Sequence, residues 1–162
     1  MSYPDISRMD ELDRKILSAL RLDARKSFLE LAKELGVADA TIHVRVKKMM
    51  EERVIKGFET VIDDGNLGYA VTAVVEIKVK PGTADEASRK LSRVEGVLEA
   101  HEVHGHCDIL LKVKSRSLPE LRDKLVREIR AAEEVVSSEA YPVLKIVKEE
   151  RNLPISPEYR TS

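Results

Sequence analysis

The 162-residue sequence lacks tryptophan and glutamine and has a single cysteine, Cys107. One cysteine excludes a disulfide framework within the chain. There is no secretory signal and no apolar run near the length of about 18 residues that suggests a membrane span. We therefore expect a cytoplasmic protein with no membrane partner. Asparagine is also scarce, and 35% of the residues are charged, a balance typical of thermophilic proteins.

The sequence also lacks an excess of charge of either sign. Its formal net charge is −1, from 28 basic and 29 acidic side chains. A strongly basic protein, which is the usual electrostatic signature of nucleic-acid binding, is thereby excluded. Residues 40–58 nevertheless carry a local excess of three positive charges. Any binding to phosphate should therefore be local, sensitive to salt and helped by oligomerisation.

Two helices are predicted in the first part of the chain. Asp10 is a suitable N-cap for a helix over MDELDRKILSALRLD, with a carboxylate three residues later. Ser27 and Glu30 have the spacing of a capping box, in which each side chain accepts a hydrogen bond from the other residue's amide. Gly36 is expected to end this second helix in the left-handed conformation.

A third helix is predicted to end near Arg53. Ala38 has no side-chain acceptor, so Asp39 is the expected N-cap. The apolar residues of the three helices recur at helical spacing. They are Leu12, Ile16, Leu17, Leu20, Leu31, Ala32, Leu35, Ile42, Val46 and Met49. Two short helices joined by a tight glycine turn are typical of a helix-turn-helix, whose second helix enters the DNA major groove.

The period of the apolar residues changes after the third helix. VIKGFETVID (54–63) is expected to be a strand with a glycine break, and DDGNLGYA (63–70) is expected to be a hinge. The elements predicted after the hinge follow in the order β-α-β-β-α-β. Strands are predicted over 71–80, 97–104, 109–114 and 135–149, with helices capped by Thr83 with Glu86 and by Ser117 with Glu120.

This order predicts a ferredoxin-like domain, in which four antiparallel strands carry two helices on one face. The other face of the sheet is left uncovered, and a twofold partner is the commonest cover. We therefore expect a homodimer through this domain. Pro142 cannot donate to a strand ladder, so it predicts an edge or a bulge in the last strand.

Both parts of the chain together resemble the Lrp/AsnC, or feast/famine, family of transcription regulators. The resemblance covers about residues 9–150. The residues that carry it are LDRKIL (12–17), DARKSFLELAKELGV (23–37), TIHVRVKKM (41–49), VIKGFETVID (54–63), EGVLEAHEVHGHCDILLKV (95–113) and VLKIVKE (143–149).

The resemblance implies a non-enzymatic α+β protein without a cofactor. It would have a helix-turn-helix (winged-helix-like) DNA-binding domain, residues 1–53, and a strand and hinge linker, 54–70. A ferredoxin-like βαββαβ (RAM-type) domain for dimerisation and effector binding would span 71–150, followed by a tail, 151–162, packed loosely or against a partner subunit. Double-stranded DNA, an amino-acid effector and assembly of homodimers to octamers or higher are the implied partners.

Helical geometry indicates which residues of the third helix face DNA. At 100° per residue, Ala40, His43, Val44 and Lys47 point away from the buried face and toward the groove floor. Phosphate contacts are the better prediction for Thr41, Arg45 and Lys48. An internal ion pair is an alternative role for Arg45, and a solvated helix face is the alternative for the lysines.

The resemblance also implies an effector site. Gly105-His106-Cys107-Asp108 matches the family's Gly-x-x-Asp loop, part of an amino-acid pocket between dimers. The residues expected to bind the effector are His104, Gly105, His106, Asp108 and Ser138. A structural role in the loop is the alternative for Asp108. Ala140 and Cys107 replace a threonine and an aromatic residue of the family pattern, which favours a smaller, less polar pocket or a regulator without an effector.

The segment HEVHGHCD (101–108) also invites a metal interpretation. On a strand, His101 and His104 lie on opposite faces, so they do not converge. No metal site within one chain is therefore expected.

Two other functions fit parts of the pattern. One is an architectural protein that wraps DNA with little base specificity. The other is a haem-pathway decarboxylase, since such enzymes resemble the two-domain layout and use histidine and arginine around a tetrapyrrole.

Overall fold

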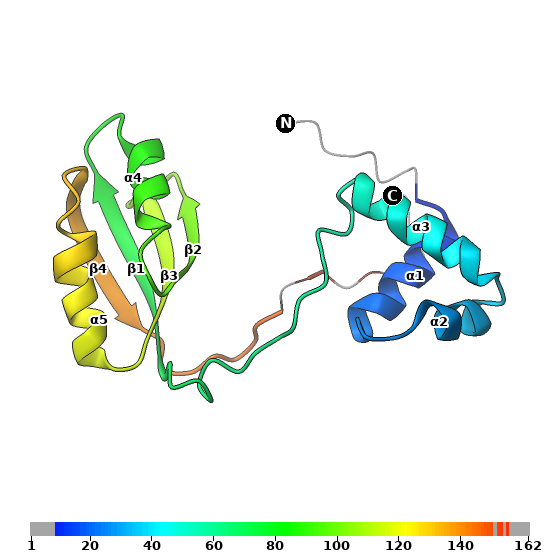
Figure 1. Cartoon of the computed structure of the whole chain (residues 1–162). Helices are drawn as coiled ribbons and strands as arrows, with labels where there is room; N and C mark the ends of the chain where they lie inside the picture. The colour runs from blue at the N-terminus through cyan, green and yellow to red at the C-terminus, as the bar shows by residue number, and fades with distance from the viewer. Residues whose placement is uncertain (1–8, 151, 154, 156–162) are drawn as a thin grey trace. The chain divides into compact units, whose positions relative to one another are not determined.

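A computed structural model describes residues 9–150, 152, 153 and 155. The chain divides into two compact units, one built on residues up to Val61 and one from Ile62 to Lys148 (Figure 1). The first is helical and the second contains a four-stranded sheet, so the predicted fold class is confirmed. No described helix has the length and apolarity to cross a membrane. The predicted tail at 151–162 lies almost wholly outside the described residues.

Three helices form the first unit: α1 (Glu11–Leu22), α2 (Phe28–Leu35) and α3 (Asp39–Glu51). Both predicted caps are confirmed, because Asp10 and Ser27 each form a reciprocal capping box. Gly36 ends α2 with φ 68°, in the left-handed region. The predicted apolar stripes make the core, in which the buried residues are Ile16, Leu20, Leu31, Ala32, Ile42, Val46 and Met49.

The start of α3 differs from the prediction. Ala38, and not Asp39, is the N-cap, and it makes no side-chain capping bond. The Ala38 carbonyl already accepts from the Thr41 amide at 2.9 Å, so the N-cap position falls on Ala38, one residue before the Asp39 carboxylate. Asp39 is therefore the first helical residue, where its charge still favours the positive end of the helix.

The strand predicted over 54–63 is wrong, since these residues form no ladder in the described structure. Val54 and Ile55 instead pack on the core of the first unit, and their amides both donate to the Met49 carbonyl. β-branched and aromatic residues favour a strand only where a neighbouring strand pairs with it. Phe58 and Val61 are left 46% and 78% exposed.

The predicted hinge contains an ordered turn. The Asp63 carboxylate accepts from the Gly65 amide at 2.9 Å, an arrangement that closes a turn. Lys114 of the sheet forms an ion pair with Asp64 at 2.7 Å, and Arg116 lies 5.5 Å above the Tyr69 ring. Residues 63–69 are therefore fastened to the second unit.

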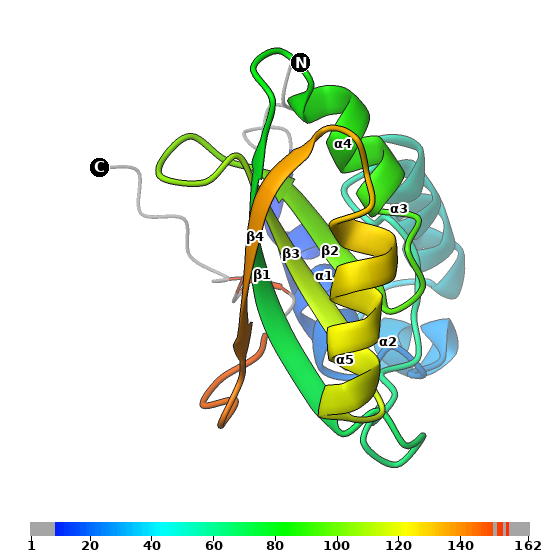
Figure 2. The same ribbon diagram turned by 90° about the vertical axis from the view of Figure 1, so that its left-hand side faces the viewer.

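The second unit follows the predicted order. Its elements are β1 (Val71–Val79), α4 (Ala84–Leu91), β2 (Val97–Glu102), β3 (Ile109–Ser115), α5 (Leu118–Lys124), a π-helical turn η2 (Leu125–Ile129) and β4 (Val135–Pro142). The strands are antiparallel in the order β2-β3-β1-β4, which is the ferredoxin-like arrangement. Helices α4 and α5 cover one face of the sheet, and the other face carries no helix of this unit (Figure 2).

Alternation along the strands explains which face is covered. Ala73, Val75 and Ile77 of β1 are buried beneath the helices, whereas Val74 between them is 38% exposed on the other face. β4 is an edge strand that ends at Pro142, which confirms the edge prediction for this proline.

One of the two caps predicted for the helices of the second unit is wrong. Thr83 makes no capping bond to α4; its hydroxyl donates to the Lys80 carbonyl at 2.9 Å. Ser117 does cap α5 by accepting from the Glu120 amide, as predicted. The Glu120 side chain bonds the Arg116 amide in place of Ser117, so this cap is not a reciprocal box.

Candidate nucleic-acid interface and second-unit site

The exposed face of α3 is the first candidate site. Ile42, Val46 and Met49 are buried, so the residues between them point away from the core. Val44 is 66% exposed on that outer face, and the Lys47 side chain is 79% exposed. Ala40 and His43 are exposed on the same stretch, and Thr41 is half-buried. An apolar side chain set among cations on an open helix face suits a groove that presents thymine methyls and phosphates.

His43 is held by two neighbours. Its ring meets the Phe28 ring edge-on at 4.8 Å between centroids, and its Nε2 lies 3.7 Å from the Asp39 carboxylate. Its side chain is still 61% exposed. The imidazole is thus oriented from α2 and from the first turn of α3 while its outer edge remains accessible.

Arg45 makes contacts within the first unit. Its guanidinium bonds the Asp10 carboxylate and lies 3.2 Å from the Asp13 carboxylate, whose side chain is 4% exposed. A hydrogen bond from the Asp13 amide and the Arg45 guanidinium hold the pKa of Asp10 below its usual range. Arg45 therefore joins α3 to α1, which favours the alternative role weighed for it from the sequence.

Lys47 and Lys48 have only distant acidic neighbours. Each lies 3.9 Å from a glutamate one turn later, Glu51 and Glu52 respectively. Exposed pairs of this kind contribute little, so these ammonium groups can exchange the glutamates for phosphates at small cost.

The loop from Val103 to Asp108 is the second candidate. Asp108 fastens it to β1, since its carboxylate accepts from the Val79 amide and its own amide donates to the Ile77 carbonyl, both at 2.9 Å. His104 and Gly105 are exposed, and a side chain at Gly105 would meet no atom within 4 Å. Ser138 is buried and bonded to the Arg130 guanidinium at 2.9 Å.

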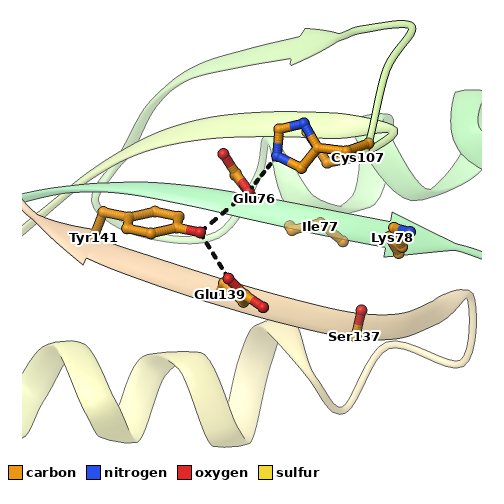
Figure 3. A pocket seen from close by; sticks show the side chains of 8 residues that line it. Glu76, Ile77, Lys78, Cys107, Ser137, Glu139 and Tyr141 are labelled. Carbon is orange, nitrogen blue, oxygen red and sulfur yellow. Dashed lines mark hydrogen bonds and ion pairs between the residues drawn. The ribbon is translucent and has the colours of Figure 1, made fainter.

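A hollow lies on the helix-free face beside this loop (Figure 3). It is lined by Glu76, Ile77, Lys78, His106, Cys107, Ser137, Glu139 and Tyr141. Of the residues predicted to bind an effector, only His106 lines it. Burial raises the pKa of the Cys107 thiol, with a smaller contribution from nearby carboxylates.

A chain of hydrogen bonds crosses the hollow. His106 Nε2 lies 2.8 Å from Glu76 Oε2. The Tyr141 hydroxyl donates to Glu139 at 2.6 Å and lies 3.4 Å from Glu76. The Glu139 hydrogen bond raises the pKa of Tyr141 to about 12. Glu76, Glu139 and Tyr141 were not predicted, because Glu76 stands on β1 and the other two stand on β4, and only the pairing of these strands brings them together.

Comparisons with known proteins agree with this architecture. Residues 9–50 match the AsnC-type helix-turn-helix domain, and residues 72–153 match the Lrp/AsnC ligand binding domain. The regulatory protein AsnC of Haemophilus influenzae is 37% identical, over 86% of this chain and 97% of its own length. The HTH-type transcriptional regulator FL11 of Pyrococcus furiosus is 34% identical, over 91% of this chain and 97% of its own length.

Solved structures show the same likeness. The structure of E. coli AsnC has a TM-score of 0.83 at 37% identity and covers 88% of this chain and 96% of its own. A feast or famine regulatory protein from M. tuberculosis, complexed with L-methionine, has a TM-score of 0.83 at 27% identity and covers 91% and 99%. The chain therefore belongs to the Lrp/AsnC family of transcriptional regulators.

Proposed function

We propose that this regulator reads DNA with the outer face of α3. The observation that carries the proposal is the exposure of Val44 and Lys47 on a helix whose opposite face is fully buried. Ala40, His43, Val44 and Lys47 contact base edges, and Lys48 and Thr41 contact phosphates. Arg45 positions α3 through its bonds to α1 and contributes little to phosphate binding.

We further propose that the chain acts as a homodimer or a larger assembly. Because the net charge of the chain is −1, a single α3 attracts DNA phosphates only weakly. Binding therefore needs two recognition helices on neighbouring half-sites. The helix-free face of the sheet supports this, because it exposes apolar and aromatic side chains such as Val74 and Tyr141. A second copy covering that face would remove them from water.

A small amino acid is the proposed effector. Support comes from the match of residues 72–153 to the family's ligand binding domain and from the relative that was solved with L-methionine. The loop residues His104, Gly105, His106 and Asp108, with Ser138, remain the proposed contacts. Because Asp108 already fastens the loop to β1, a ligand bound there would act on the loop's position. We propose no catalytic role and no membrane partner, with the protein acting in the cytoplasm.

Selection of bound genomic fragments tests the proposal. The full chain is mixed with sheared genomic DNA, with and without a pool of amino acids, and its mass is measured under native conditions. The expected result is a shared sequence motif with two half-sites and a mass of at least a dimer. Fragments without any shared motif would instead support an architectural DNA-wrapping protein, and no retained DNA would contradict the proposal. An effect of the amino-acid pool on retention or mass would identify an effector.

A further inference from the structure

Three side chains of different chemistry converge in the hollow on the helix-free face. Glu76 comes from β1, and His106 and Cys107 come from the loop between β2 and β3. One ligand atom from each, a carboxylate oxygen, an imidazole nitrogen and the sulfur, lies within 4.8 Å of the other two. These three groups are separated by up to 31 positions in sequence, so only the fold brings them together.

These three donor atoms favour one class of metal ion over others. A thiolate, an imidazole and a carboxylate are the three protein ligands that zinc uses, at about 2.0–2.3 Å from the ion. Calcium and magnesium prefer oxygen ligands, so the sulfur and nitrogen argue against them. Tetrahedral coordination places ligand atoms roughly 3.4 Å apart at these bond lengths. The present 2.8 Å between His106 and Glu76 therefore needs to widen by about 0.6 Å, and ligand atoms that lie as far apart as 4.8 Å need to approach each other. The His106 side chain is 77% exposed and has room to move.

The charges around the hollow favour a cation. Glu76 and Glu139 stand directly opposite each other on β1 and β4. Like charges in that position destabilise a sheet unless something lies between them. Here the Tyr141 hydroxyl bridges the two carboxylates (Figure 3). An ion bound to Glu76 would offset the same repulsion, with Tyr141 orienting the carboxylate from outside the coordination shell.

We propose that Glu76, His106 and Cys107 bind one divalent transition-metal ion of the zinc type, with a water molecule in the fourth position. The ion would join the loop to β1 beside the bond that Asp108 makes to Val79. Neither His101 nor His104 takes part: His101 pairs with Glu99 at 3.2 Å. The proposal departs from the expectation that one chain holds no metal site, because that expectation considered only residues 101–108, whereas Glu76 comes from β1.

This site is separate from the proposed DNA-reading function. It shares only His106 with the residues proposed for an amino-acid effector. Its failure would leave the selection of DNA by α3 untouched, and loss of DNA binding would leave the metal measurement unchanged.

Cobalt titration tests the proposal. The full chain, without a histidine tag, is treated with chelator under reducing conditions, dialysed and titrated with Co²⁺. The expected result is a thiolate-to-cobalt charge-transfer band that saturates at one ion per chain and is abolished by added Zn²⁺. Cys107→Ser should remove the band, and Glu76→Gln and His106→Gln should each weaken binding by roughly 100-fold or more, since each removes a direct ligand.

His104→Gln is the matched control, because it changes a neighbouring exposed histidine outside the cluster. It should bind Co²⁺ like the parent protein. Circular dichroism melts of each variant check that the fold is kept, and isothermal titration with Zn²⁺ gives a second readout. The proposal is overturned if the parent protein shows no charge-transfer band, or if His104→Gln loses it as fully as His106→Gln. A stoichiometry of one ion per two chains would overturn the single-chain ligand set.

Discussion

Arg45 is a cation on the recognition helix α3 whose contacts stabilise the first unit. Its guanidinium bonds two carboxylates of the first unit, and the Asp13 side chain beneath it is 4% exposed. Arg45→Ala leaves that carboxylate buried without its charge partner. The free energy of unfolding should fall by about 1–3 kcal/mol, measured by urea denaturation.

Lys47→Ala is the control for that substitution, because Lys47 lies on the same helix but is exposed. It should change stability by no more than about 0.5 kcal/mol. If Arg45→Ala weakened DNA binding with no loss of stability, Arg45 would be a phosphate contact and the structural role would be wrong.

Asp10 links the stability of the first unit to pH. Its pKa lies below the ordinary value of 3.8 in the folded protein, chiefly through the Asp13 amide and then through Arg45. The stabilisation is fully present above that ordinary value and is lost as pH falls through the lower, folded pKa. Asp10→Asn keeps an oxygen for the cap but removes the charge. The variant should be less stable at neutral pH, and in melts across pH the difference from the parent should shrink as the pH falls from 3.8 through the lower, folded pKa of Asp10. A constant difference at all pH values would contradict this.

The sequence predicts the surroundings of some side chains but not of others. Spacing alone places Val44 and Lys47 opposite the buried stripe, because helical geometry fixes the direction of each side chain. Arg45 needs the position of α1, and the Glu76, Glu139 and Tyr141 group needs the pairing of β1 with β4. Contacts of that kind are set by tertiary structure and leave no local pattern.

At the scale of elements, alanine substitutions at two glycines distinguish the cost of backbone strain from the cost of a steric clash. Gly36 has φ 68°, and a Cβ there would meet nothing within 4 Å. Gly96 has φ 84°, and its Cβ would lie 2.4 Å from the Lys114 carbonyl oxygen in the neighbouring strand. Gly36→Ala should cost about 1–2 kcal/mol of stability from strain alone. Gly96→Ala should cost more than about 3 kcal/mol, because β3 must also move. Urea unfolding of both variants measures this, and equal losses would contradict the packing around Gly96.

Capping signals in the sequence were confirmed as reciprocal boxes at Asp10 and Ser27, whose side chains satisfy amides within their own helices, but Thr83 makes no capping bond to α4. The strand expected over 54–63 failed for the opposite reason. A strand is stabilised by a neighbour, and β-branched residues such as Val54 and Ile55 pack equally well on the helical core. The third helix lacks its expected cap because the Ala38 carbonyl accepts the first helical hydrogen bond, which places the N-cap at Ala38 and Asp39 inside the helix.

For the whole molecule, the helix-free face of the sheet is the proposed dimer surface. Val74 lies on this face in the central strand β1, and Val126 is a similarly exposed valine in the helical layer, at 38% and 53% exposure. Val74→Lys places a charge in the proposed interface and should shift the native mass toward the monomer. Val126→Lys should not. Dissociation of Val126→Lys alone would place the interface on the helical side.

The central claim is that α3 binds DNA through its exposed lysines. The most direct measurement is the affinity for a selected DNA fragment as a function of salt, for the parent chain, for Lys47→Ala and Lys48→Ala, and for Arg122→Ala. Arg122 is an exposed cation of the second unit and serves as the control. Each lysine variant should bind more weakly. For Lys48→Ala, which removes a phosphate contact, the plot of log affinity against log salt should flatten by about one unit. Lys47→Ala, which removes a base contact, should mainly relax the sequence preference. Arg122→Ala should match the parent. Lysine variants with unchanged affinity and slope would contradict the assignment of this face.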